Sequence, residues 1–170
     1  HFITANEGTA IGLAAGHHLA TGEIPLVYMQ NSGLGNAVNP LTSLADPAVY
    51  GVPLLMMIGW RGEPGVKDEP QHVTMGRVTP ATLDAVGIAS SILPEDEDAA
   101  VSAISDAVRT MRASHAPHAF VVRKGAFSSY KLERARPDPY EMSRERALDI
   151  LLSSLPERAA VVSTTGMPSR

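Results

Sequence analysis

The sequence predicts an α/β fold with a parallel, doubly wound sheet flanked by helices, and three observations indicate it. Short apolar runs alternate along the chain with helix-like segments, as in repeated strand-helix-strand units. The run at 53–58, Pro-Leu-Leu-Met-Met-Ile, is apolar almost throughout, which is typical of a strand buried on both faces of a parallel sheet. Two strand-like runs, at 1–4 and 24–30, break directly into small, glycine-bearing turns, and such corners form ligand sites in parallel sheets.

The first half of the chain is predicted to alternate strands and helices before a long loop. The expected elements, in order, are a strand, a helix rich in Ala and Gly, a strand, a helix and a strand, at residues 1–4, 7–20, 24–30, 35–45 and 53–58. The loop that follows, at about 60–76, is polar and rich in Gly and Pro. Loops of this length are uncommon inside compact domains and tend to be functional.

The second half is predicted to complete the sheet. Thr79-Pro80 predicts the start of a short helix, because proline in the first helical position costs no hydrogen bond. A brief strand near 89–93 precedes the clearest helix, whose acidic start at 95–98 and basic last turn complement the helix dipole. A strand at 119–122 is the last element of this domain.

The composition changes after Phe127. We expect a domain at 1–127, a linker at 128–142, and at 143–170 the start of a second domain, with a helix from Ser143 and a strand near 159–163. Because the chain opens and closes within or just after strand-like runs, we expect a piece of a longer polypeptide.

Composition excludes several classes of function. A formal net charge of -4, without a Lys/Arg cluster, argues against a nucleic-acid surface. The absence of cysteine excludes disulfides, thiolate zinc sites and a cysteine nucleophile. No apolar run approaches the roughly 20 residues that span a bilayer, and no signal peptide is recognisable, so the expected location is the cytoplasm.

Several motifs together resemble those of a known superfamily. They are Asn-Glu-Gly at 6–8, Gln-Asn-Ser-Gly-Leu-Gly-Asn at 30–36, Asn-Pro-Leu-Thr-Ser-Leu-Ala-Asp at 39–46, Gly-Trp-Arg-Gly-Glu-Pro-Gly at 59–65 and Asp-Glu-Pro-Gln-His at 68–72. Residues 2–127 resemble the pyrimidine-binding domain of thiamin-diphosphate enzymes, and within that superfamily most resemble the phosphonopyruvate decarboxylases. The sulfopyruvate decarboxylases share the glycine segment but are less similar in the 60–72 loop.

The resemblance implies a lyase of phosphonate biosynthesis that converts phosphonopyruvate to phosphonoacetaldehyde and CO₂, with thiamin diphosphate and Mg²⁺. It also implies that a diphosphate-binding domain missing from this chain holds the diphosphate and the metal, so no metal ligand is expected here. Active sites would form between subunits of a homo-oligomer. Two alternatives stay open, namely the alpha subunit of a sulfopyruvate decarboxylase and a non-catalytic binding module with the same fold.

Glu7 is the main catalytic candidate. In the resembled family a glutamate hydrogen-bonds the pyrimidine nitrogen N1′ and thereby activates the cofactor. The spacing Thr4-x-x-Glu7 offers an alternative, because it also matches a helix capping box. Gly12 and Gly16 lie four residues apart on the same helix, which allows another backbone to approach, either in a second subunit or in the sheet.

The resemblance assigns the remaining site residues to the glycine turn and the long loop. The expected cofactor-binding residues, besides Glu7, are Asn31, Ser32, Gly33, Leu34 and Gly35; the alternative is a plain strand-to-helix turn. Gln71 and His72 are expected to face the keto acid, and His72 is a candidate proton shuttle, unless it is a surface histidine. Arg61, Lys67 and Arg77 are candidates for binding the phosphonate dianion, and at least one of them is expected to do so, although each one taken singly is more typical of a solvated loop residue.

Overall fold

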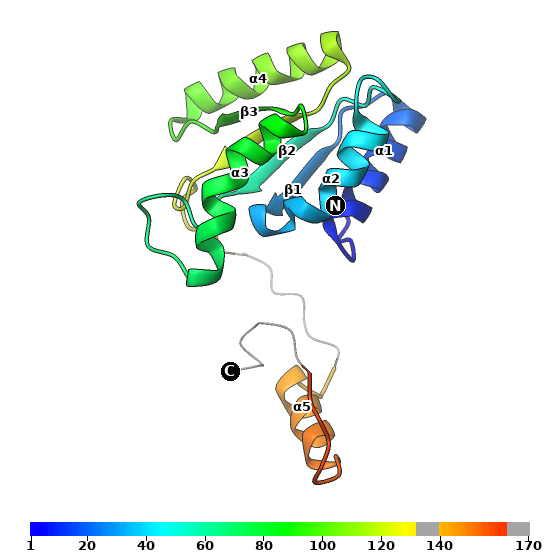
Figure 1. Ribbon diagram of the computed structural model, residues 1–170, viewed down its shortest axis with the longest axis vertical. Coiled ribbons are helices and arrows are strands. Elements are labelled where there is room, and N and C mark those ends of the chain that lie inside the picture. The colour runs from blue at the N-terminus through cyan, green and yellow to red at the C-terminus, as the bar shows by residue number, and fades with distance from the viewer. Residues whose placement is uncertain (132–139, 163–170) are drawn as a thin grey trace. The chain divides into compact units, whose positions relative to one another are not determined.

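The computed structural model describes residues 1–131 and 140–162. The chain divides into two compact units, His1–Ser128 and Ser129–Arg170, and each is described by itself. The first unit contains the whole sheet (Figure 1).

The sheet has four parallel strands in the order β1-β2-β4-β3. They are β1 Leu26–Gln30, β2 Leu55–Gly59, β3 Ala89–Ile92 and β4 His118–Val122. The predicted parallel α/β fold is therefore confirmed, as are its strands at 24–30, 53–58, 89–93 and 119–122, to within two residues at each end. The last residues of three strands, Gln30, Gly59 and Val122, lie in register, so the segments that follow these strands meet at one edge of the sheet.

Helices cover both faces of the sheet (Figure 1). Three helices, α1 Glu7–Thr21, α2 Leu34–Pro40 and α3 Val73–Ala85, share one core cluster, and α4 Glu97–Ser114 packs in the other. Strand β4 alternates between the two cores, because Ala119 and Val121 belong to the first and Phe120 and Val122 to the second. The predicted helices at 7–20 and 35–45 are confirmed, the second as α2 followed by a π-helical turn, η2 Leu41–Ala45. The helix predicted after Pro94 is α4.

The strand predicted at 1–4 is wrong. These residues form no strand, and Phe2 and Ile3 are 84% and 89% exposed. A strand requires a hydrogen-bonded neighbour, and within the described residues the sheet ends at β1 without pairing to this segment. The β-prone composition of residues 1–4 was therefore insufficient to predict their conformation.

The helix predicted to begin at Thr79 in fact begins at Val73, so Pro80 lies inside α3. Proline lacks the N–H that would bond the carbonyl of Gly76, four residues earlier. The indole N–H of Trp60 donates to this carbonyl instead, at 2.8 Å. The proline rule failed here because a side chain from the end of β2 replaces the missing donor.

The first turn of α3 packs directly on the turn after β2. A Cβ at Gly76 would lie 1.7 Å from the carbonyl oxygen of Gly62, and a Cβ at Gly62, whose φ is +68°, would lie 2.0 Å from the carbonyl oxygen of His72. These neighbours are backbone atoms, which cannot rotate away. The two glycines therefore allow the turn after β2 to touch the start of α3, and the loop predicted at about 60–76 ends before the turn η3 Pro70–His72 and α3.

Replacing Gly76 with alanine is expected to destabilise the chain by about 1–3 kcal/mol, because the methyl group overlaps the Gly62 backbone. Gly35→Ala is the matched control for stability, since Gly35 also lies in a helix, α2, and no atom lies within 4 Å of its added Cβ; it is expected to stabilise α2 by up to about 1 kcal/mol. Chemical denaturation of both variants measures the difference. Equal stability of Gly76→Ala and the wild-type chain would contradict the close packing.

The second unit contains one helix within its described residues, α5 Arg144–Ser153. Ser143 caps it by accepting a hydrogen bond from the amide of Arg146 at 3.1 Å, which confirms the predicted helix start. The strand predicted at 159–163 is wrong over 159–162, which form no strand and leave Val162 96% exposed. Residue 163 and residues 132–139 of the predicted linker lie outside the described residues.

Candidate active site

The glycine turn follows β1 directly and leads into a helix. A short 3₁₀ turn, η1 Asn31–Gly33, joins β1 to α2. Glu7, the first residue of α1, lies against this turn, because a Cβ at Gly33 would be 2.3 Å from the Glu7 carboxyl carbon. Asn36, in the first turn of α2, donates from Nδ2 to Glu7 Oε2 at 3.0 Å. The structure therefore brings the predicted catalytic carboxylate and the predicted cofactor turn together.

The capping-box interpretation of Glu7 is wrong. Asn6 is the N-cap of α1, and its Oδ1 accepts from the amide of Thr9 at 2.9 Å. The Thr4 hydroxyl donates to the carbonyl of Asn6 at 3.0 Å and makes no bond to the helix amides. The Glu7 side chain is therefore not needed to cap the helix, and its carboxylate faces the turn.

The surroundings of Glu7 favour its ionised form. The hydrogen bond from Asn36 holds the pKa of the Glu7 carboxyl below its usual range, helped by the backbone N–H of Glu7 itself. The side chain is partly exposed. Glu7 therefore presents a charged hydrogen-bond acceptor at the carboxyl edge of the sheet, where ligands of open α/β sheets bind.

The residues of the glycine turn differ in the exposure of their side chains, and so in whether a ligand can reach them. The side chain of Leu34 is fully buried in the core, and that of Asn31 is fully buried and bonded within the chain. Ser32 is exposed, and no atom lies within 4 Å of a Cβ added at Gly35. A ligand can thus approach the turn at Ser32 and Gly35.

Two ion pairs anchor the long loop. Arg61 donates from Nε and Nη2 to the two carboxylate oxygens of Asp68, at 2.9 and 2.7 Å, and Asp68 also accepts from the amide of Gly62 at 2.7 Å. Glu63 pairs with Arg123, at the end of β4, at 3.0 Å. The loop is therefore a fixed part of the edge where β1, β2 and β4 end.

Asp68 makes the stability of this loop dependent on pH. The Arg61 guanidinium, followed by the amides of Gly62 and Glu69, holds the pKa of Asp68 well below its usual range. A lowered pKa in the folded state stabilises the fold above the ordinary pKa, and this contribution is lost as the pH falls through the folded value. We expect Asp68→Asn to lower the unfolding free energy at pH 7, and this difference to shrink below about pH 4. Denaturation curves from pH 2 to 8 measure this. A difference in unfolding free energy between the wild type and Asp68→Asn that did not change with pH would contradict the role given to Asp68.

The predicted substrate residues lie on or beside this loop. Gln71 is exposed and His72 half-buried, in the short turn η3 Pro70–His72 that leads into α3. Lys67 in the loop and Arg77 in α3 are exposed. Arg61 differs from the other two basic candidates because its charge is offset by Asp68.

Sequence reasoning missed several residues of this region: Asn36, Glu63, Asp68, Thr79 and Arg123. Only Asn36 had a local signal, since it directly follows the glycine turn on the first turn of a helix. Glu63 and Arg123 come together because β2 and β4 are neighbours in the sheet, Thr79 reaches Asn31 from α3, and Arg61 and Asp68 meet through the conformation of the loop itself.

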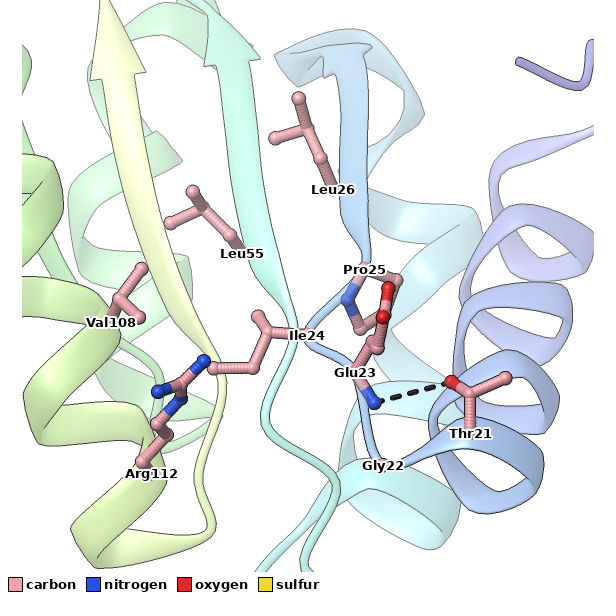
Figure 2. A pocket seen from close by; sticks show the side chains of 9 residues that line it. All are labelled: Thr21, Gly22, Glu23, Ile24, Pro25, Leu26, Leu55, Val108 and Arg112. Carbon is pink, nitrogen blue, oxygen red and sulfur yellow. Dashed lines mark hydrogen bonds between the residues drawn. The ribbon is translucent and has the colours of Figure 1, made fainter.

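A separate cavity of about 370 Å³ lies where β1 and β2 begin, bordered by Thr21, Glu23, Leu26, Leu55 and Arg112 (Figure 2). This is the amino end of the strands, opposite the edge that carries Glu7. Ligands in open parallel sheets bind at the carboxyl ends, so this cavity is not the candidate site.

The described residues contain neither a metal-binding cluster nor a membrane-spanning helix. Within residues 1–131 and 140–162, no group of three or more His, Asp or Glu side chains is arranged to hold a metal ion. None of the helices in these ranges is both long and apolar enough to cross a membrane.

Comparison with known proteins identifies the family. The model of the thiamine pyrophosphate enzyme N-terminal TPP binding domain matches residues 1–87, half of the 170-residue chain. The chain belongs to the thiamine pyrophosphate enzymes. The match includes Glu7 and the Gly33 turn, so the family predicted from the motifs is confirmed.

Within this family, the chain is similar to two kinds of decarboxylase. The whole chain aligns at 36% identity with phosphonopyruvate decarboxylase of Streptomyces viridochromogenes and at 37% with that of Streptomyces hygroscopicus, covering 46% and 45% of those proteins. Sulfopyruvate decarboxylase subunit alpha of Methanothermobacter thermautotrophicus is 44% identical, over 46% of this chain and 46% of the relative. The chain thus spans about half the length of the relatives that it matches.

Proposed function

We propose that the whole protein is a thiamin-diphosphate-dependent decarboxylase that converts phosphonopyruvate to phosphonoacetaldehyde and CO₂. The observation that carries this proposal is the Glu7 carboxylate, held against the Gly33 turn in a chain of the thiamine pyrophosphate enzyme family. Similarity to phosphonopyruvate decarboxylases over the full chain favours phosphonopyruvate, since the sulfopyruvate decarboxylases that the chain matches align with 46% to 63% of it.

The residues present fit the pyrimidine half of the cofactor. The Glu7 carboxyl group would share a proton with N1′, and the exposed turn at Ser32 and Gly35 would allow a flat ring to approach the backbone. Glu7 also lines a groove of about 840 Å³ between α1 and β1, with largely apolar walls. When bound, thiamin diphosphate supplies the electron sink that decarboxylation of a 2-keto acid requires.

Substrate recognition is assigned to the loop and the start of α3. Gln71 and His72 would hydrogen-bond the keto acid, with His72 moving a proton at its imidazole. Lys67 and Arg77 are the cations whose charge remains available for a phosphonate, because Asp68 engages Arg61 in a bidentate pair. Arg61 would then act mainly by shaping the loop.

We propose that the whole protein is a homo-oligomer with active sites between subunits, and that Mg²⁺ and the diphosphate are held by a second domain. Gly12 and Gly16 support an interface on α1, because no atom lies within 4 Å of a Cβ added at either position. Light scattering of the whole protein measures the assembly. A cytoplasmic location is also proposed, since a chain without cysteine has no disulfide for an oxidising compartment to form.

Product analysis tests the proposed function. The whole protein, incubated with phosphonopyruvate, Mg²⁺ and thiamin diphosphate, is expected to form phosphonoacetaldehyde, and omission of thiamin diphosphate is expected to stop its formation. Phosphorus NMR distinguishes the aldehyde from the substrate. Absence of the aldehyde in the complete mixture would refute the assignment.

A further inference from the structure

Asn31 and Thr79 are the two polar residues that the described part of the chain buries completely. Buried polar groups require hydrogen-bond partners, and both polar atoms of the Asn31 side chain have them. Its Nδ2 donates to the carbonyl of Arg61 at 2.8 Å and to Thr79 Oγ1 at 2.9 Å, and its Oδ1 accepts from the amide of Arg61 at 3.0 Å. A side-chain amide that donates a hydrogen bond to the main chain of a residue and also accepts one from it makes the same pair of bonds as a neighbouring strand.

The Asn31 side chain therefore extends the sheet beyond its last paired residues. The last paired residues of β1 and β2 are Gln30 and Gly59. The side-chain amide of Asn31, which follows Gln30, bonds to the main chain of Arg61, two residues beyond Gly59. This bond joins the Gly33 turn to the start of the long loop. Within the described residues, it is a side chain and not the main chain that holds these two segments together at Arg61.

Thr79 connects the same network to α3. Its hydroxyl accepts from Asn31 and donates to the carbonyl of Met75 at 2.6 Å, and one turn away Trp60 donates to Gly76. Helix α3 begins directly after Gln71 and His72. The network therefore runs from the turn that contacts Glu7 to the helix that follows the candidate substrate residues.

We propose that Asn31 and Thr79 are positioning residues, which fix the Gly33 turn and Glu7 relative to the segment that carries Gln71 and His72. This inference rests on the proposed function for its catalytic consequence. Neither side chain is exposed, so neither touches substrate or cofactor. Displacing reacting groups by about 1 Å is enough to lower rates by about 100-fold, and a loosened network would allow such a displacement.

The test compares three variants of the whole protein. Thr79→Val removes the hydroxyl while keeping the shape, and Thr79→Ser keeps the hydroxyl. Thr82→Val is the matched control, because the Thr82 hydroxyl makes the same kind of bond on the same helix, to Val78 O at 2.9 Å, without contacting Asn31. Amide hydrogen exchange of segments 29–36 and 59–72 is measured, along with kcat and KM for phosphonopyruvate.

Thr79→Val is expected to speed exchange in both segments and to lower kcat by about 10- to 100-fold at unchanged KM. Thr79→Ser and Thr82→Val are expected to keep the wild-type values. Faster exchange confined to α3, or an unchanged kcat in Thr79→Val, would overturn the positioning role. An inactive wild-type protein would instead refute the proposed function and with it the catalytic part of this role, whereas the exchange data decide separately whether the two segments are coupled.

Discussion

Replacing Glu7 with glutamine is expected to lower turnover of the whole protein by about 10²- to 10⁴-fold, the usual contribution of a positioned proton-transfer group. Glutamine has nearly the same size and still accepts a hydrogen bond from Asn36, but its amide cannot share a titratable proton with N1′ as a carboxyl group does. The fold should persist, because Asn6 and not Glu7 caps the helix. Steady-state decarboxylation and thermal unfolding measure the two effects.

Glu97→Gln is the control for this experiment. Glu97 is the first residue of α4, as Glu7 is of α1, so both substitutions remove a negative charge from a helix N-terminus. Asp96 caps α4 through its bond to the amide of Ala99. Loss of activity in Glu7→Gln alone would support the catalytic role. Full activity of Glu7→Gln would refute it.

Gly33→Ala is expected to reduce turnover nearly as much as Glu7→Gln, with little loss of stability. The added methyl group would lie 2.3 Å from both Cδ and Oε1 of Glu7. The end of a glutamate side chain is free to rotate away, and Gly33 has a φ of -86° that alanine also adopts. The fold can therefore accept the substitution, but the carboxylate must leave its position beside Asn36.

This outcome contrasts with that expected for Gly76→Ala, where the obstructing atoms are backbone. The comparison of the two variants separates a clash that displaces a catalytic group from one that destabilises the fold. Unfolding free energies and turnover numbers should be measured for both. A Gly33→Ala protein that is unstable, or that is stable and fully active, would contradict the placement of Glu7.

The sheet was predictable from the sequence because its strands are marked by local composition. The apolar run at 53–58 indicated a strand inside a parallel sheet, and the glycine corner after residue 30 indicated the end of a parallel strand; the structure has parallel strands at both places. The failures were at positions where tertiary contacts override local preference. Residues 1–4 have strand-like composition but no partner, and Pro80 is tolerated inside α3 because Trp60 bonds the carbonyl that the proline leaves free.

The candidate site was predictable only in part. The motifs indicated Glu7 and the glycine turn, and the structure places them in contact. The pairing of Arg61 with Asp68, and the bonds of Asn31 to Arg61 and Thr79, span 7, 30 and 48 residues of sequence. No local periodicity encodes such pairs, because they depend on the path of the loop and on which elements pack together. The roles of Gln71, His72, Lys67 and Arg77 remain predictions.

The most direct test of the central claim is CO₂ release by the whole protein with thiamin diphosphate and Mg²⁺, with phosphonopyruvate, sulfopyruvate and pyruvate compared at equal concentration. We expect phosphonopyruvate to be turned over fastest. A preference for sulfopyruvate would contradict the substrate assignment while keeping the chemistry. No release from any of the three, by a protein shown to contain a diphosphate-binding domain, would contradict the assignment as a decarboxylase and favour a binding module.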